Sequence, residues 1–148
     1  MANVDVVQGL WSAVHERDWE GVARHLADDA VYYDVPTGPA TAAKGPAGIV
    51  ARLRLGLGDL AGYEHRPGVM AADGDTVLFE HSETWTWPTG ETVTLPFVTV
   101  HRVVGDRVTL WRDYWDYETL RRGAPPDWEA RLMAADVASW LYDATGEV

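Results

Sequence analysis

The chain of 148 residues has the length of one domain, and its 47% hydrophobic and 24% charged residues are typical of a globular protein. A formal net charge of −11 argues against binding to nucleic acid or to an anionic membrane surface, because both are polyanions. The absence of cysteine excludes disulfides, a thiolate nucleophile and zinc sites built on sulfur. No apolar run approaches the roughly 20 residues of a membrane span and no signal-peptide pattern is present, so we expect a cytoplasmic protein.

The first third of the chain predicts three helices and one strand. Residues 4–16 carry apolar side chains at helical spacing, and Asp18 can cap a second helix that continues to Leu26. Residues 30–36 are rich in strand-forming side chains. A loop rich in glycine and proline then leads to Pro46, which fits the first turn of a third helix.

The rest of the chain predicts strands joined by short turns, followed by one more helix. The turn sequences DGDT, PTGE and GDR separate the strands, and GAPPDW precedes the helix. Helices that precede a run of antiparallel strands require the sheet to wrap around a helix. We therefore predict an α+β fold in which a cone-shaped, curved sheet, mixed but mostly antiparallel, encloses a cavity around the N-terminal helices. The predicted strands are 63–71, 76–87, 91–103 and 107–117, and the predicted helix is 127–143.

The pattern favours one domain over residues 1–148, since no repeat or long linker divides it. Residues 125–148 form a helical appendage in this interpretation. Its large apolar side chains favour a place over the cavity mouth or in a subunit interface.

Strand alternation assigns the candidate site, because residues two apart on a strand share a face. If the faces that carry most aromatic side chains are concave, the cavity contains three carboxyl groups, from Asp34, Glu83 and Asp113. The same faces carry the other candidates for the site, which are Tyr32, Phe79, His81, Trp85, Trp111 and Trp115.

A carboxyl group among indole rings is poorly solvated, and a neighbouring carboxylate adds repulsion, so at least one pKa should be raised. Such a pair can act as acid and base. We predict catalytic roles for Asp113, Asp34, Glu83 and Tyr32. The substrate-binding candidates are Phe79, His81, Trp85, Trp111 and Trp115, with a purely structural role as the alternative for His81.

Two segments resemble a known family. The sequence WRDYWD at 111–116, preceded by PTGETVTLPFVTVHRV, resembles limonene-1,2-epoxide hydrolase-like members of the SnoaL-like group, which have the nuclear transport factor 2-like fold. The sequence ADDAVYYDVPTGPA is similar to the family segment whose Tyr and Asn position a water molecule. The resemblance implies that Asp113 is the general base, that Tyr32 contacts the water, and that Asp34 stands where the family has Asn.

The chain also departs from the family's pattern. Epoxide hydrolases of the family carry an Arg and an Asp two residues apart on a middle strand, where this chain has SETWTW with Glu83 and Trp85. The family mechanism therefore cannot be transferred directly. Our working hypothesis is that Glu83 donates the proton while Asp34 or Asp113 activates water.

Three functions remain open at this point. The first is an enzyme without a cofactor that opens an epoxide of a small hydrophobic molecule, by hydrolysis or by cyclisation. The second is a SnoaL-like polyketide cyclase or a ketosteroid isomerase-like enzyme that uses the same acids. The third is a non-catalytic binder of a small ligand, including a cationic one, because carboxylates beside Trp faces attract cations. No metal-binding or dinucleotide motif is present, and the resemblance implies a homodimer.

Overall fold

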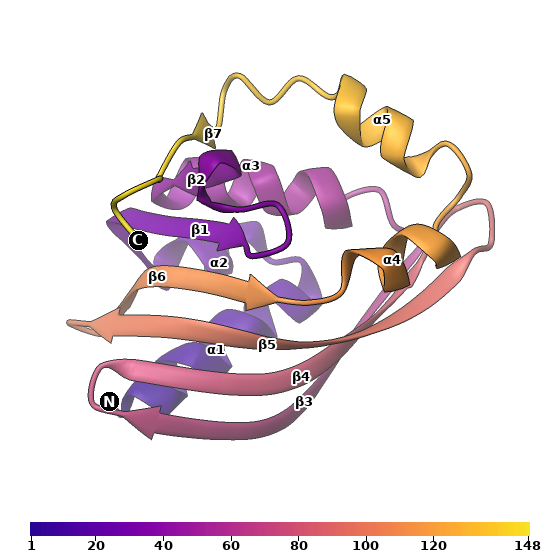
Figure 1. Cartoon of the computed structure of the whole chain (residues 1–148). Helices are drawn as coiled ribbons and strands as arrows, with labels where there is room; N and C mark the ends of the chain where they lie inside the picture. The colour runs from indigo at the N-terminus through magenta and orange to yellow at the C-terminus, as the bar shows by residue number, and fades with distance from the viewer.

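The computed structural model describes residues 1–148 and contains a seven-stranded curved sheet (Figure 1). The strand order is β3-β4-β5-β6-β1-β2-β7, and all pairs are antiparallel except β1 and β6, which run parallel. The strands are β1 (Leu26–Asp34), β2 (Ala42–Lys44), β3 (Gly62–Asp73), β4 (Thr76–Thr86), β5 (Thr92–Val104), β6 (Arg107–Tyr114) and β7 (Leu141–Tyr142).

The N-terminal helices pack against this curved sheet (Figure 1). Helix α1 (Asn3–Glu16) presents Val7, Leu10 and Val14, all fully buried, to a core of 25 residues that the sheet shares. Helix α2 (Trp19–Arg24) follows, and its cap Asp18 accepts a hydrogen bond from the backbone of Gly21. Helix α3 (Gly45–Leu57) lies against β1 and β2. Burial of these apolar stripes drives the wrapping of the sheet.

The register of the central strands places the polar residues. In the parallel pair β1/β6, Tyr32 lies opposite Trp111 and Asp34 lies opposite Asp113. On the other side of β6, Thr99 of β5 also lies opposite Asp113. Residues in register share a face, so Asp34, Asp113 and Thr99 form one row across three strands.

The predicted fold class is confirmed, but several boundaries differ. The second helix ends at Arg24, because Leu26 already pairs with Val108 as the first residue of β1. The last long strand ends at Tyr114, so Trp115 lies just beyond it. The segment predicted as a loop after Pro36 contains a 3-10 turn (Pro39–Thr41) and the short strand β2.

The C-terminal segment differs most from the prediction. Helix α4 (Tyr117–Gly123) was not predicted, although Asp116 caps it by accepting a 3.1 Å bond from the Thr119 backbone. The helix predicted at 127–143 spans only Trp128–Ala134, as α5. The chain then becomes irregular and reaches β7, which pairs with the open edge of β2. An unpaired edge leaves backbone groups without partners, so this pairing competes with further helix.

None of the helices has the length and apolar character required to cross a membrane.

Candidate functional site

A cavity of about 370 Å³ lies between the sheet, α3 and the C-terminal segment. Most of its lining is hydrophobic, and the polar lining side chains come from the sheet, from α3 and from the turn between β1 and β2. The C-terminal segment covers it with Trp128, Leu132 and Trp140, among others. The six lining residues that the sequence predicted are Tyr32, Asp34, Glu83, Trp85, Asp113 and Trp115.

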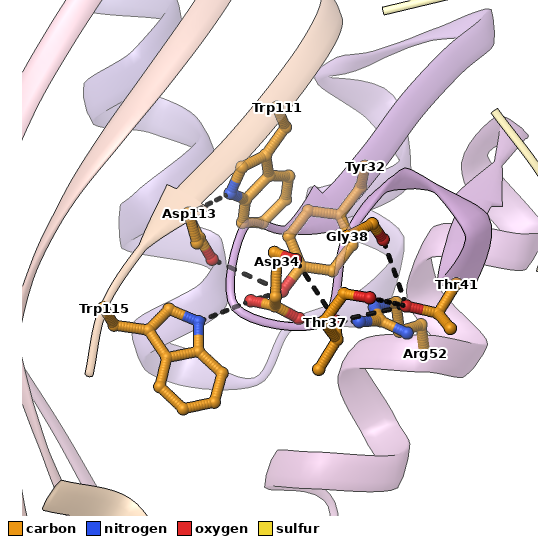
Figure 2. A network of polar contacts seen from close by, with 9 residues as sticks. All are labelled: Tyr32, Asp34, Thr37, Gly38, Thr41, Arg52, Trp111, Asp113 and Trp115. Atoms are coloured by element: carbon orange, nitrogen blue, oxygen red, sulfur yellow. Dashed lines mark hydrogen bonds and ion pairs between the residues drawn. The ribbon is translucent and has the colours of Figure 1, made fainter. Parts of the chain in front are cut away.

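Asp34 forms an ion pair with an arginine from α3. Its Oδ2 lies 2.7 Å from Nη2 of Arg52, and the two side chains are only 15% and 13% exposed. Its Oδ1 accepts hydrogen bonds from the indole of Trp115 at 2.9 Å and from the hydroxyl of Tyr32 at 3.0 Å (Figure 2). These three donors surround the carboxylate of Asp34, and the guanidinium of Arg52 balances its charge.

Arg52 is held by more than this ion pair. Its guanidinium lies over the rings of Tyr32, at 5.3 Å, and Trp140, at 5.1 Å. Burial is the largest single effect and opposes its charge, but the interactions with Asp34 and Tyr32 together outweigh it, and the pKa of Arg52 is raised. Arg52 therefore joins the carboxyl group on the sheet to the C-terminal segment that covers the cavity.

Asp113 lies deeper than Asp34 and has no cationic partner. Its Oδ1 accepts hydrogen bonds from the Thr99 hydroxyl at 2.7 Å and the Trp111 indole at 2.8 Å. Burial raises the pKa of Asp113 well above its usual range, and repulsion from Asp34 adds to this, while the bonds from Thr99 and Trp111 oppose it. The neutral carboxylic acid is therefore the favoured form of Asp113.

The hydroxyl of Tyr32 connects the two aspartates. It lies 3.0 Å from Oδ1 of Asp34 and 3.3 Å from Oδ2 of Asp113 (Figure 2). A phenol has one hydrogen to donate, and the shorter contact is the one to the anion. The Tyr32 oxygen can then accept a hydrogen bond from neutral Asp113. Burial, followed by the neighbouring carboxyl groups of Asp34 and Asp113, raises the pKa of Tyr32, so the phenol stays protonated.

Glu83 is the third carboxyl group of the cavity, and it is 7% exposed. Burial raises its pKa to about 7, against the opposing effect of the Trp85 indole, which donates to Oε2 at 2.7 Å. The buried hydroxyl of Tyr63 also lies beside this carboxyl group and lowers its pKa, but burial outweighs both donors. Near neutral pH both charge states of Glu83 are therefore populated.

Three of the predicted substrate-binding residues do not line the cavity. Trp111, Phe79 and His81 are between 0% and 3% exposed and belong to the interior. The reason is Trp11 of α1, whose ring lies 5.2 Å from that of Trp111 and 4.3 Å from that of His81. Trp11 fills the part of the cone that these side chains face, so all three pack behind it in the interior.

Two parts of the site were not predicted. Arg52 was missed because the sequence does not show which helical side chains point at the sheet; its one signal is its place beside the apolar stripe of Ile49, Leu53 and Leu57. The cover over the cavity was left open as one of two alternatives for the C-terminal segment, and the lining by Trp128 and Trp140 shows that this segment covers the cavity. No cluster of three or more histidine or carboxylate side chains is arranged to bind a metal ion.

Comparison with known proteins identifies the family from residues 7–111, which match the model of the SnoaL-like domain. The chain belongs to the SnoaL-like domain family. The matched region ends two residues before Asp113, so this SnoaL-like protein carries its most buried carboxyl group beyond it.

Solved structures agree with this assignment. An epoxide hydrolase from M. tuberculosis that is similar to limonene-1,2-epoxide hydrolase has 26% identity and a TM-score of 0.71, over 90% of this chain and 96% of that one. A putative SnoaL-like polyketide cyclase from Shewanella denitrificans has 20% identity and a TM-score of 0.74, over 82% and 95%. A protein of ketosteroid isomerase-like fold from Catenulispora acidiphila, in complex with trimethylamine, has 20% identity and a TM-score of 0.69, over 83% and 95%. No curated protein matches the chain.

The ion pair generates a first prediction. Arg52→Met should destabilise the protein by about 3 kcal/mol, because it leaves the buried Asp34 charge unpaired. The double variant Arg52→Met/Asp34→Asn should recover most of this loss, because both charges are gone. Urea denaturation measures both values. Arg121→Met, which breaks an exposed pair with Glu118, is the control and should leave the denaturation midpoint unchanged. Equal losses in the single and double variants would contradict the ion-pair argument.

The raised pKa of Glu83 generates a second prediction. Its folded value of about 7 exceeds the ordinary value of 4.5, so its favourable contribution is complete below pH 4.5 and is lost as pH rises through about 7. Glu83→Gln removes this loss. Relative to the wild type, the variant should gain about 3 kcal/mol in the free energy of unfolding between pH 4.5 and about pH 8. Urea denaturation across this pH range tests it, and a constant difference between the two proteins would be the contrary result.

Proposed function

We propose that this SnoaL-like protein opens an epoxide ring of a small hydrophobic molecule, with carboxyl groups as acid and base and without a cofactor. The observation that carries the proposal is the unequal environment of two carboxyl groups on one apolar cavity. Asp113 is buried with donors on one oxygen and favours its neutral form, while Glu83 has a pKa of about 7. When the environments of two carboxyl groups push their pKa values apart, the difference assigns the acid and base roles.

Asp113 supplies the proton in this mechanism. As the carbon–oxygen bond of the epoxide breaks, the departing oxygen takes the proton of Asp113. The new carboxylate is stabilised by the donors Thr99 and Trp111, and the Tyr32 hydrogen can turn to it from Asp34. Interactions that strengthen as charge develops lower the barrier. Arg52 keeps the charge of Asp34 balanced while this happens.

Glu83 accepts the proton in this mechanism. Its pKa of about 7 is matched to neutral pH, where a general base must be both ionised and basic enough to act. It takes a proton from the water that attacks the epoxide carbon, and a diol forms. If a hydroxyl of the substrate attacks instead, the product is a cyclic ether. In either case the proton on Glu83 exchanges through solvent and Asp113 is reprotonated, so the protons balance.

This assignment reverses the one that the family resemblance implies, in which Asp113 is the base. The reason is burial: a base must be ionised, and Asp113 is buried without a cation to stabilise its charge. The 26% identity with an epoxide hydrolase supports the reaction class. The residue roles rest on the geometry of this chain.

The other two functions have less support. Proton transfer on a carbonyl compound, as in a polyketide cyclase or an isomerase, would use the same acids, so products must distinguish it from epoxide opening. A cage for a cationic ligand needs uncompensated negative charge. Asp34 is already paired with Arg52 and Asp113 favours its neutral form, which leaves Glu83 alone.

Isotope labelling of products tests the reaction. The protein is incubated with a panel of cyclic and acyclic epoxides in ¹⁸O-labelled water, and mass spectrometry identifies the products. We expect labelled diols, or unlabelled cyclic ethers where the substrate carries a hydroxyl. Asp113→Asn and Glu83→Gln should each lower kcat/KM by about 10² to 10⁴. The absence of product from every epoxide would reject the proposal, whatever the protein does to carbonyl compounds.

The dependence of rate on pH tests the two roles. Because Glu83 must be ionised, kcat/KM should rise with pH to an apparent pKa of about 7 and then level. It should fall again at higher pH, where Asp113 loses its proton. Glu83→Gln should remove the acidic limb from the residual activity and leave the alkaline limb. An acidic limb that persists in this variant would assign the base elsewhere.

A further inference from the structure

A line of hydrogen-bonding side chains reaches Asp113 from the side opposite the cavity. Nε2 of His65 lies 2.7 Å from Nδ1 of His81, and Nε2 of His81 lies 2.7 Å from the Thr99 hydroxyl. The same hydroxyl donates to Oδ1 of Asp113, again at 2.7 Å. His81 and Thr99 are 3% and 0% exposed, so water does not replace these contacts. His65, His81 and Thr99 do not line the cavity.

The two histidines are neutral at ordinary pH. Burial, with a smaller contribution from neighbouring histidines, lowers the pKa of His81 to about 2 and that of His65 to about 4. A neutral imidazole has one nitrogen that donates and one that accepts. The three contacts can therefore run in only two consistent directions, either all towards Asp113 or all away from it.

The direction is decided at Asp113. If the bonds ran away from it, Oδ1 would carry the carboxyl proton and donate it to Thr99. The Trp111 indole, which can only donate, also points at Oδ1, at 2.8 Å. The protonated oxygen of a carboxylic acid is a weaker acceptor than its carbonyl oxygen. Two donors on Oδ1 therefore favour bonds that run towards Asp113.

We infer that His65, His81 and Thr99 form a hydrogen-bond chain that runs in one direction and ends on Oδ1 of the catalytic carboxyl group. This chain keeps the exchangeable proton of Asp113 on Oδ2, the oxygen nearer to Tyr32 and the cavity. His81 and Thr99 are thus positioning residues that act through Asp113, and the inference rests on the proposed role of Asp113 as the acid.

The surroundings of the chain are consistent with this direction. His101 is also buried beside His81, but it accepts from the Trp11 indole through Nε2 at 2.9 Å and faces the Val77 carbonyl through Nδ1 at 3.2 Å. It is therefore neutral and turned away from Asp113. His15 of α1 accepts from the backbone of His65 and is the one further histidine near it. The remaining titratable groups near Asp113 are Tyr32, Tyr63, Asp34 and Glu83.

Nuclear magnetic resonance of ¹⁵N-labelled histidine tests the direction in the wild-type protein. We expect His81 to carry its hydrogen on Nε2, with Nδ1 bare. A hydrogen on Nδ1 would overturn the inference, because Thr99 would then donate to His81 and not to Asp113. This readout needs neither substrate nor turnover, so it succeeds or fails independently of the proposed epoxide chemistry.

Titration of the Asp113 carboxyl carbon, in protein labelled with ¹³C-aspartate, tests the effect on the acid. Thr99→Val removes the donor and should raise the pKa of Asp113 by about one unit or more, since hydrogen bonds to a charged group contribute about 1.5–3 kcal/mol. The alkaline limb of kcat/KM should move with it. Thr99→Ser should restore both values, and Thr94→Val, which removes an exposed hydroxyl from the same strand, should change neither.

His81→Phe tests whether His81 affects the pKa of Asp113 through the hydroxyl of Thr99. The imidazole stacks between Phe79, at 4.2 Å, and Phe97, at 3.7 Å, so a phenyl ring can replace its shape. The pKa of Asp113 should rise in this variant too, but by less than in Thr99→Val, because Thr99 loses only the donor that strengthens its own bond. An unchanged Asp113 titration in Thr99→Val would overturn the inference.

Discussion

The structure depends on a shortage of positive charge in the cone. The parallel pairing of β1 with β6 brings Asp34 opposite Asp113, and one cation, Arg52, reaches the pair. Two ionised carboxyl groups that lie close together and are shielded from solvent would repel strongly, so one of them keeps a proton. Arg52 decides which one, because it contacts Asp34 alone. The arrangement of Tyr32 and Trp115 around Asp34, and of Thr99 and Trp111 around Asp113, follows from this division.

Much of the fold and part of the site were accessible from the sequence. Strand periodicity of two placed Asp34, Glu83 and Asp113 on concave faces, and all three line the cavity. The same rule could not tell how far into the cone a residue lies. Phe79 and His81 share a face with Glu83, but Trp11 occupies the space before them. That contact joins a helix to a sheet, and periodicity within a strand carries no information about it.

The role of Arg52 and the extent of the last helix could not be predicted from the sequence, for a related reason. Arg52 belongs to α3, and its partner Asp34 belongs to β1, so their contact depends on how the helix sits on the sheet. The length of the last helix was overestimated because the open edge of β2 is a tertiary feature, and Leu141–Tyr142 pair with it instead of extending the helix. The sequence predicts elements more securely than the contacts between them.

Trp11 has a consequence for the interior as a whole. It separates the concave space of the sheet into the cavity and an interior region that is filled by side chains. On one side, the carboxyl groups meet whatever enters the cavity; on the other, His81 and His101 exchange hydrogen bonds only with protein. The pKa of the acid that faces the substrate can thus be adjusted by interior residues that the substrate does not contact. A change of ligand preference and a change of acidity would then arise from mutations in different places, which lets selection adjust the two properties separately.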